Sequence, residues 1–366
     1  MKVCFDHQIF TMQRYGGISR YFANICNSLE AREDAECKLL VLYSRNQYIQ
    51  DRQFPMPPFL AERLLKKYRK QAKWNEKYAR RHIQKSEFDV LHPTYYHPYF
   101  LEGLKKPFVI TVHDMIHELF PEYFSTNEIY VQYKRETITR ADHLIAISES
   151  TKNDLQRIYN IPEEKITVVY HGYQENPALL HADKDTAFTL PFREYVLFVG
   201  DRAGYKNFGR FVQAVKPVLE RYDINLVCAG GGDFGVAEKE MLYRAGIQNR
   251  AKQISATETQ LNSLYQNALA FIYPSLYEGF GLPILEAFRN NCPIITSNTS
   301  CFQEVGGEAA VYFDPYQIDE MAQSIDAVIN SKELSGQLRA KGAQRLGRFS
   351  MERCMEGTMD VYRKLV

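Results

Sequence analysis

Short apolar segments with the length of β-strands alternate with helix-like segments along almost the whole chain. In the first half, the strand candidates are 3–6, 38–43, 89–91, 108–112, 143–146 and 167–170. A second series follows at 195–199, 225–229, 270–273, 294–297 and 310–313. This alternation is typical of parallel sheets whose strands are joined by crossover helices. We therefore expect an α/β fold with two doubly wound, Rossmann-like domains.

A polar stretch that contains proline separates the two series and lacks a sustained apolar period, as expected of a linker. The length of 366 residues also suits two ordinary domains. We predict an N-terminal domain at 1–180, a linker at 181–194 and a C-terminal domain at 195–349. An amphipathic helix is predicted at 350–366. Ligands of such domains bind at the carboxyl ends of the strands.

Composition excludes several classes of protein. With 45 basic and 44 acidic residues, the chain lacks the charge excess of a nucleic-acid binder. Seven cysteines without paired spacing indicate reduced thiols. The chain begins directly with a strand pattern, and no apolar run approaches the ~20 residues of a membrane span. We expect a cytoplasmic protein.

The segment between the strand candidates 270–273 and 294–297 contains the most informative motif. A glycine-broken turn at Glu278-Gly279-Phe280-Gly281 leads into a helix pattern that begins at Leu282-Pro283. Proline suits the start of a helix, where its missing N–H is not needed. A glycine-rich turn before a helix N-terminus offers N–H groups and a positive dipole to a phosphate. Glu278 and Glu286 bracket this turn, which would suit a nucleotide-sugar.

The two glutamates, eight residues apart within Tyr-Glu-Gly-Phe-Gly-Leu-Pro-Ile-Leu-Glu at 277–286, resemble the signature of glycosyltransferase family 4. The resemblance implies the GT-B fold, in which two Rossmann-like domains face a central cleft and a C-terminal helix crosses back to the first domain. It also implies retaining transfer of a hexose from a UDP- or GDP-linked sugar to a glycan or lipid-linked saccharide acceptor. A metal or other cofactor is not required in this family.

The donor site is predicted in the second domain. Arg202 and Lys206 follow the strand candidate 195–199, where cations can hold a pyrophosphate. Relatives often have Arg-Lys-Asn here, whereas this chain has Tyr205-Lys206-Asn207 with its arginine displaced to position 202. By resemblance, Glu286 binds the ribose, Glu278 lies near the sugar, and the base lies near Ile254. The resemblance also assigns backbone contacts with phosphate or sugar to Gly279, Phe280, Gly281 and Leu282.

The acceptor site is predicted in the first domain. Gly16 and Gly17 precede a helix and would allow positive φ and a close approach of the backbone to a ligand. By resemblance, this glycine loop faces both the donor phosphate and the acceptor, so the two glycines are also predicted to bind the donor. His113 ends the strand candidate 108–112, and by resemblance contacts the donor sugar; an ordinary histidine there titrates near neutral pH. Weaker candidates for acceptor binding are Asp114, Ser148 and Glu149, although Ser148 could equally be a helix cap.

No covalent nucleophile other than Glu278 stands out in the sequence. We therefore expect catalysis to depend on stabilising the charge of the leaving diphosphate. Arg202, Lys206 and the helix beginning near Leu282 would neutralise the diphosphate. His113 and Glu278 complete the predicted catalytic set. Surface polysaccharide or lipopolysaccharide synthesis is a setting suggested by resemblance only.

Alternative interpretations remain. Residues 230–235 satisfy the G-x-G-x-x-G pattern of an NAD-dependent oxidoreductase, although they follow the second strand of their domain and no acid ends the next strand. A non-catalytic protein that binds nucleotide-sugar or glycan is a further alternative. His113 and His117 have helical metal-site spacing, but the sequence offers no third ligand, so we expect no metal.

The segment 61–85 is strongly basic. Residues 62–87 hold ten Lys or Arg and three acids, and the apolar residues fall near one face of a predicted helix: Leu60, Leu64, Leu65, Tyr68, Ala72 and Trp74. A basic amphipathic helix suits an anionic membrane surface, which would place the protein peripherally at the inner face of the cell membrane. An ordinary solvated helix is the alternative.

Overall fold

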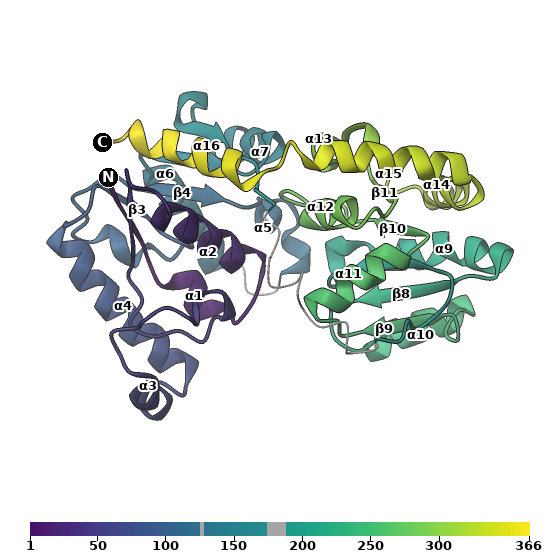
Figure 1. Ribbon diagram of the computed structural model, residues 1–366, viewed down its shortest axis with the longest axis horizontal. Helices are drawn as coiled ribbons and strands as arrows, with labels where there is room; N and C mark the ends of the chain where they lie inside the picture. The colour runs from purple at the N-terminus through teal and green to yellow at the C-terminus, as the bar shows by residue number, and fades with distance from the viewer. Residues whose placement is uncertain (125–127, 174–187) are drawn as a thin grey trace. The chain divides into compact units, whose positions relative to one another are not determined.

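The computed structural model describes residues 1–124, 128–173 and 188–366 of the chain. These residues form two compact units, each an α/β domain with parallel strands (Figure 1). Unit 1 consists of Met1–Gly172 together with Met351–Val366, and unit 2 consists of Tyr173–Ser350. Residues 181–187 of the predicted linker lie outside the described residues.

Unit 1 begins with a strand and alternates strands with helices. Its strands are β1 Lys2–Phe5, β2 Glu36–Leu39, β3 Val90–His92, β4 Val109–Val112, β5 His143–Ala146 and β6 Ile166–Val168. Its α-helices are α1 Gln8–Met12, α2 Gly17–Glu30, α3 Pro58–Leu64, α4 Tyr68–Lys85, α5 Ile116–Leu119, α6 Glu128–Arg140, α7 Glu149–Tyr159 and α16 Met351–Arg363. Short 3-10 helices are η1 Gln47–Ile49, η2 Pro98–Leu101, η3 Pro121–Tyr123 and η4 Glu163–Lys165.

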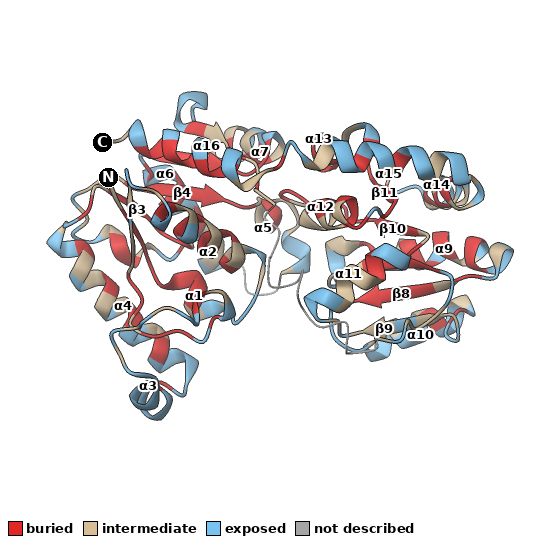
Figure 2. Ribbon diagram, viewed as in Figure 1, coloured by how far each residue is buried: buried red, intermediate tan, exposed pale blue. Residues whose placement is uncertain are grey.

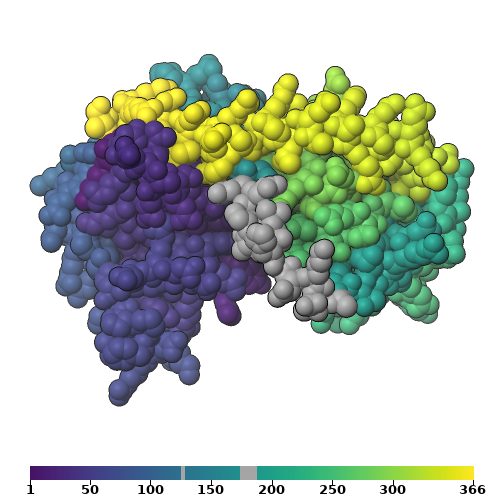
Figure 3. Space-filling model, viewed as in Figure 1, coloured from purple at the N-terminus to yellow at the C-terminus, as the bar shows by residue number. Residues whose placement is uncertain are grey.

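The strands of unit 1 lie in the orders β2-β1-β3 and β4-β5-β6, and a parallel bridge between Leu91 and Phe108 connects the two groups. Helix α16, at the far end of the sequence, packs against this unit. Its Met359 and Tyr362 belong to the same apolar core as Phe22 of α2. Figures 1 and 3 show the yellow helix beside the purple N-terminal elements. The last helix of the chain is therefore part of the core of unit 1.

Unit 2 repeats the alternation of strand and helix. Its strands are β7 Tyr195–Val199, β8 Asn225–Ala229, β9 Ala251–Ile254, β10 Ala270–Tyr273, β11 Ile294–Ser297 and β12 Ala310–Phe313. Its helices are η5 Gly204–Lys206, α9 Phe208–Tyr222, α10 Val236–Ala245, α11 Glu258–Asn267, α12 Leu282–Arg289, α13 Phe302–Gly306, η6 Gly307–Ala309, α14 Ile318–Asn330 and α15 Lys332–Leu346.

The strands of unit 2 form one sheet in the order β12-β11-β10-β7-β8-β9. The chain builds outward from β7 to β9 on one side, and then returns to add β10, β11 and β12 on the other. The order therefore reverses between β7 and β10, which pair directly at Val196 and Ala270. In a doubly wound sheet, ligands bind beyond the carboxyl ends of the strands at this reversal.

The core of unit 2 follows from the spacing of apolar residues on α9. Phe208, Phe211, Val215 and Leu219 recur every three or four residues and are all buried. They pack in one cluster with strand residues such as Phe198. Buried strands and exposed outer faces of the helices are visible in Figure 2. Truncating one of these phenylalanines to alanine would cost about 3–5 kcal/mol of stability.

The strands predicted at 143–146, 195–199, 225–229, 270–273, 294–297 and 310–313 are confirmed residue for residue. A prediction about the first half was wrong: the basic segment 61–85 forms two helices instead of one. The helix breaks between α3 and α4 because Lys67 is extended, with φ −87° and ψ 132°. The short helix α1 also lies between β1 and the Gly16-Gly17 turn.

All seven cysteines are free, and six of them are buried. In the described part of the chain, helices are either too short or too polar to cross a bilayer.

Candidate active site

Two charged residues meet where the strand order of unit 2 reverses. Lys206 lies beyond the end of β7, and Glu278 lies beyond the end of β10. Lys206 Nζ is 2.6 Å from Glu278 Oε1, and each side chain is only 14% exposed. Burial alone would lower the pKa of Lys206, but the adjacent Glu278 carboxylate outweighs this effect and the pKa is raised. Lys206 is therefore a fixed positive charge at neutral pH.

Backbone and side-chain hydrogen bonds hold the two loops together. The N–H of Leu276 donates to the carbonyl of Tyr205 at 2.8 Å. Asn207 is buried, and its Nδ2 donates to the carbonyls of Pro274 at 3.1 Å and Pro315 at 2.8 Å. Its backbone has a φ of 59°, a left-handed conformation that asparagine tolerates well. Asn207 thus locks the residue next to Lys206 onto the loop that carries Glu278.

The loop after β11 supports Glu278 from its other side. The N–H of Glu278 donates to Ser300 Oγ at 3.2 Å, and the thiol of Cys301 donates to the Glu278 carbonyl at 3.3 Å. Thr299 Oγ1 donates to the carbonyl of Leu276 at 2.9 Å. The loop carrying Glu278 is therefore held by side chains from the next strand connection.

Gly281 makes the turn into α12. Its φ is +86°, so a residue with a side chain would be strained there, and a Cβ would also lie 3.3 Å from Ile284 Cδ1. Helix α12 begins at Leu282, with a proline in its first turn as predicted. Gly279 and Phe280 lie between Glu278 and this turn and are buried. The predicted strand, glycine turn and helix are confirmed.

Arg202 does not have the predicted phosphate-binding geometry. Its side chain is 1% exposed, and Nε lies 2.7 Å from Glu238 Oε1. Nη1 donates to the carbonyl of Gly230 at 2.7 Å, and Nη2 donates to that of Gly232 at 2.8 Å. The guanidinium also stacks over the Phe234 ring at 5.0 Å. Its donors are occupied inside the domain, so the prediction for Arg202 is corrected to a structural role.

The G-x-G-x-x-G run at 230–235 is explained by the same contacts. Gly230, Gly231 and Gly232 all have positive φ, and a Cβ on Gly231 would lie 2.7 Å from Nη1 of Arg202. These glycines turn their carbonyl oxygens toward a cation, whereas a dinucleotide fingerprint presents N–H groups to a pyrophosphate. The run is a cradle for Arg202.

Two other predicted donor residues, Glu286 and Ile254, lie on helix α12 and on the edge strand β9 of unit 2. Glu286 is half-buried on α12, and the hydroxyl of Tyr265 donates to its Oε2 at 3.3 Å. Burial, together with Glu286, raises the pKa of Tyr265, so this hydroxyl remains a donor. Ile254 is the last residue of β9 and is half-buried. Both residues are therefore on elements that connect to the carboxyl edge of the sheet.

His113 lies directly after β4 in unit 1, inside a group of aromatic rings. It is buried, stacks on His171 with ring centroids 5.8 Å apart, and meets the ring of Tyr21 edge-on. Burial, with smaller effects from His92 and Lys134, lowers the pKa of His113 to about 3. The expected titration near neutral pH is therefore wrong, and His113 is neutral. Within the described residues, its Nε2 is buried without a hydrogen-bond partner.

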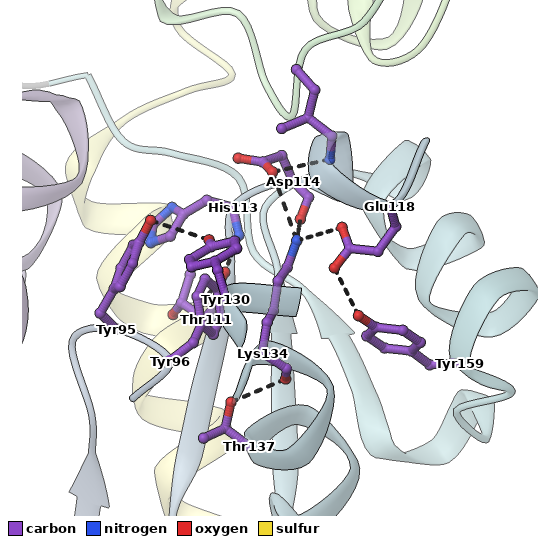
Figure 4. Close-up of polar contacts among 11 residues, drawn as sticks. Tyr95, Tyr96, Thr111, His113, Asp114, Glu118, Tyr130, Lys134, Thr137 and Tyr159 are labelled. Carbon is purple, nitrogen blue, oxygen red and sulfur yellow. Dashed lines mark hydrogen bonds and ion pairs between the residues drawn. The ribbon is translucent and has the colours of Figure 1, made fainter. Parts of the chain in front are cut away.

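Asp114 is held by a buried lysine (Figure 4). Lys134 is 0% exposed, and its Nζ donates to the carbonyl of Asp114 at 2.7 Å and to Glu118 Oε2 at 2.9 Å. Asp114 Oδ1 accepts from the N–H of Ile116 at 3.1 Å, and the hydroxyl of Tyr159 donates to Glu118 Oε1 at 2.7 Å. Lys134 thus fixes the segment that follows β4.

The remaining predicted residues of unit 1 have mainly local roles. Ser148 is buried and caps α7, where its Oγ accepts from the N–H of Thr151 at 3.0 Å. The structure therefore supports the role of Ser148 as a helix cap. Glu149 is an exposed residue in the first turn of α7. Neither Gly16 nor Gly17 has the predicted left-handed backbone. A Cβ on Gly16 would instead lie 2.5 Å from Gln13 Oε1, so the flexible Gln13 side chain would have to move to admit one.

The part of the chain that the structure describes contains no cluster of three or more His, Cys, Asp or Glu side chains with the arrangement of a metal site.

Comparison with known proteins matches both units. The family model for glycosyl transferases group 1 covers residues 187–345, and the model for glycosyltransferase family 4 covers residues 15–176. The chain belongs to glycosyltransferase family 4. It is 28% identical over 207 residues to the O-antigen chain mannosyltransferase RfbU of Salmonella typhimurium, covering 56% of each chain. It is 26% identical over 288 residues to O-antigen chain mannosyltransferase B of Escherichia coli, covering 75% of this chain and 73% of that protein.

The fold of this family 4 glycosyltransferase is GT-B. It resembles the crystal structure of Anabaena HepE in complex with UDP and glucose, with a TM-score of 0.70 and 16% identity over 100% of this chain and 99% of that one. The predicted fold and family are confirmed, and the oxidoreductase alternative is excluded by the family. The chain spans little more than half of the length of RfbU.

Sequence reasoning missed three residues that shape the sites of this glycosyltransferase. Asn207 joins the loops after β7 and β10, Tyr265 contacts Glu286, and Lys134 anchors Asp114. Asn207 stands beside a predicted site residue, so its strand-end position was a usable signal. The other two act through contacts between elements distant in sequence, which the sequence pattern does not reveal.

Proposed function

We propose that this family 4 glycosyltransferase transfers a hexose, with mannose as the first candidate, from a nucleotide diphosphate sugar to a glycan or lipid-linked saccharide in surface polysaccharide synthesis. The observation that carries the proposal is the Lys206–Glu278 pair at the strand reversal of unit 2. This is the position at which a doubly wound sheet binds phosphate-containing ligands. Mannosyltransferases among the relatives, RfbU and O-antigen chain mannosyltransferase B, support mannose.

Lys206 would stabilise the departing nucleoside diphosphate. An ammonium group has three N–H donors, and one of them is used by Glu278 at 2.6 Å. The other two have no hydrogen-bond partner among the described residues, although the rings of Tyr205 and Tyr273 lie 5.1 and 5.8 Å from Nζ. They are available to phosphate oxygens. Charge that develops on the leaving group is stabilised most by donors that are already oriented, because no reorganisation is needed. The Glu278 carboxylate supplies that orientation and can accept a hydrogen bond from a sugar hydroxyl.

We propose retention of anomeric configuration. In this reaction the acceptor hydroxyl attacks the anomeric carbon from the face that the diphosphate leaves, and a departing phosphate oxygen takes the acceptor proton. The neutral His113, with a buried and unpaired Nε2 among the described residues, is suited to a hydrogen bond with a sugar hydroxyl and not to proton transfer. Product stereochemistry, read from the anomeric proton by NMR, tests this step.

Thermal melting with UDP, GDP, ADP, their common sugars and NADH tests donor binding. A ligand at a hundred times its dissociation constant adds about 2.7 kcal/mol of stability. We expect one nucleoside diphosphate to raise the melting temperature of the parent, and the shift to disappear in Glu286→Ala but persist in Glu308→Ala, whose side chain is 89% exposed. A shift with NADH alone would contradict the proposal.

We also propose that α3 and the start of α4 rest on an anionic membrane surface. Large apolar side chains are exposed there: Phe59 (71%), Leu60 (39%), Leu64 (47%), Tyr68 (56%) and Trp74 (49%). Of the apolar residues that the sequence placed on one face, Leu65 is instead buried. Figure 2 shows α3 as almost entirely exposed. The exposed basic residues beside them are Lys66, Lys67, Arg69, Lys70 and Lys73.

The single tryptophan, Trp74, reports on this contact. Vesicles of phosphatidylglycerol at low salt should shift its emission to shorter wavelength and sediment the protein, whereas phosphatidylcholine vesicles should do neither. Reversing the charges of Lys66, Lys67, Arg69 and Lys70 should abolish both effects. The control reverses four exposed cations of unit 2: Lys239, Lys252, Lys332 and Arg348. Equal sedimentation of both variants with the parent would contradict the membrane proposal.

A further inference from the structure

A cavity of about 480 Å³ lies within unit 1, at the carboxyl end of β1 and beside the connection that follows β2. Its lining residues all belong to unit 1, whereas Lys206 and Glu278 belong to unit 2. Its volume is within the range of pockets that hold small ligands. Helix α3, the short connection after it and the first residue of α4 line the cavity through Glu62, Lys66 and Tyr68, respectively.

The lining of this cavity carries an excess of positive charge. Arg14, Arg45 and Lys66 line it, against the single acidic residue Glu62. In the described residues, none of these three cations has a side-chain hydrogen bond or an ion pair, although the surface of unit 1 has many ion pairs elsewhere. Three cations gathered without acidic partners repel one another, so an anion that binds between them is stabilised by all three.

A buried framework holds the cavity walls in place. Asn75 is 0% exposed, and its Oδ1 accepts from the N–H groups of Leu42 and Tyr43 at 2.9 and 3.1 Å. Its Nδ2 donates to Thr11 Oγ1 at 3.0 Å and to the carbonyl of Tyr43 at 2.9 Å. Gln71 Nε2 also donates to that carbonyl at 3.2 Å. One asparagine therefore ties α1, the connection after β2 and α4 together.

The two arginines are positioned by the same framework. The N–H of Gln47 donates to the carbonyl of Arg14 at 2.9 Å. Asn46, which follows Arg45, is buried, and its Nδ2 donates to the carbonyl of Gln13 at 2.9 Å. The backbone segments that carry the two arginines are thus fixed side by side. Two guanidinium groups that line one cavity from fixed backbones are suited to the several oxygens of a phosphate.

The rest of the lining is aromatic or apolar. Phe10 and Tyr43 are buried beneath the cavity, while Met12 and Tyr68 line it with 47% and 56% of their surface exposed. A phosphate that carries an apolar chain could place its charge between the arginines and its chain along these side chains. Leu64 of α3, two residues before Lys66, is also exposed.

We propose that this cavity binds a phosphate or diphosphate ester, and that the acceptor of the transferase is such a phosphate-linked molecule. The acceptor assignment rests on the proposed function, whereas the phosphate site itself does not. The ester could come from a lipid-linked molecule or from a free phosphorylated one, and the two sources share the contacts with Arg14, Arg45 and Lys66.

Isothermal titration calorimetry at low salt with three probes tests the site. We expect geranyl diphosphate to bind the full chain and geraniol not to bind. Inorganic pyrophosphate separates the two sources: comparable binding of pyrophosphate assigns the site to the phosphate alone, and much weaker binding assigns it to phosphate on an apolar chain. Binding of geraniol as tight as that of geranyl diphosphate would overturn the proposal.

Matched variants locate the binding. The double variant Arg14→Gln, Arg45→Gln should weaken geranyl diphosphate binding on the order of tenfold or more, because two charge-assisted contacts are lost. The control double variant Arg81→Gln, Lys105→Gln removes the same charge from exposed positions of unit 1 outside the cavity lining and should bind like the parent. Equal loss in both variants, or none in the first, would overturn the proposal. Circular dichroism checks that both are folded.

Thermal melting with the nucleotides, measured on the same samples, tests the transferase proposal independently of the phosphate site. Binding of geranyl diphosphate without any nucleotide shift would contradict the transferase proposal and leave the phosphate site supported. A nucleotide shift without geranyl diphosphate binding would overturn the phosphate site alone.

Discussion

Lys206 and Glu278 stand 72 residues apart in the chain, yet their side chains meet at 2.6 Å. They meet because β7 and β10 are neighbours in the sheet, although two further strands separate them in sequence. The loops that follow these two strands therefore lie next to each other at the carboxyl edge of the sheet. Asn207 and the backbone bond from Leu276 to Tyr205 then hold the two loops together. A charged pair with this support offers a rigid contact for a diphosphate.

Arg202 should contribute to stability and not to donor binding. Replacing it by alanine would leave Glu238 and the carbonyls of the glycine cradle without their partner, which should cost about 3–5 kcal/mol. We expect the melting temperature to fall on the order of 10 °C, while the affinity for a nucleoside diphosphate, measured at low temperature, stays close to that of the parent.

The control for Arg202 is Arg244→Ala, which removes an arginine whose side chain is 77% exposed and paired with Glu240 on the same helix. This change should alter stability by less than about 0.5 kcal/mol. If Arg202→Ala melts like Arg244→Ala but loses nucleotide binding, Arg202 contacts phosphate after all.

The contacts of the Arg202 side chain could not be predicted from the sequence. The strand-end loop, its glycines and its cations were all correctly located from the sequence. The direction of the Arg202 side chain depended on three left-handed glycines 28 to 30 residues later, which curl around the guanidinium. Strands were predicted well because continuous apolar runs of that length are buried in parallel sheets. Side-chain partners across such distances leave no local pattern.

Buried Lys134 should be needed for the stability of unit 1 (Figure 4). Lys134→Met would leave the Glu118 carboxylate, which is 5% exposed, without its cation, and should cost about 3–5 kcal/mol in urea unfolding followed by circular dichroism. The double variant Lys134→Met, Glu118→Leu removes both charges and should recover most of the loss. Equal stability of the single and double variants would show that the unpaired carboxylate is not the cause.

The break between α3 and α4 was also not foreseen. The periodicity of residues 61–85 suits one continuous amphipathic helix. In the structure, Leu65 turns into the core with Ala61 and Tyr43, and its apolar neighbours remain exposed. The burial of Leu65 is a tertiary contact, and the periodicity of the sequence does not reveal such contacts.

Stability should fall in acid before carboxylates are protonated. Burial lowers the pKa of His92 and of His113 to about 3, and that of His171 well below its ordinary value. Between pH 6.5 and about 3 the unfolded chain binds more protons than the folded one. The contribution of these histidines to the free energy of unfolding is therefore complete above pH 6.5 and decreases as the pH falls. These three groups alone contribute a slope of up to about 4 kcal/mol per pH unit.

Urea unfolding at a series of pH values between 7 and 4 checks this slope. His92→Gln should reduce the slope by about one proton, because one buried imidazole is removed. Stability that stays constant down to pH 5 would contradict the account of the neutral histidines.

The most direct test of the central claim is the turnover of a nucleotide diphosphate sugar by Lys206→Ala, beside the parent and Lys216→Ala. Lys216 lies on α9 with 43% of its side chain exposed and serves as the matched control. Loss of one oriented donor at a developing anion typically costs about a hundredfold or more in turnover. We predict a loss of that size for Lys206→Ala and parent-like turnover for Lys216→Ala. Turnover of Lys206→Ala within a factor of about three of the parent would contradict the role of the Lys206–Glu278 pair.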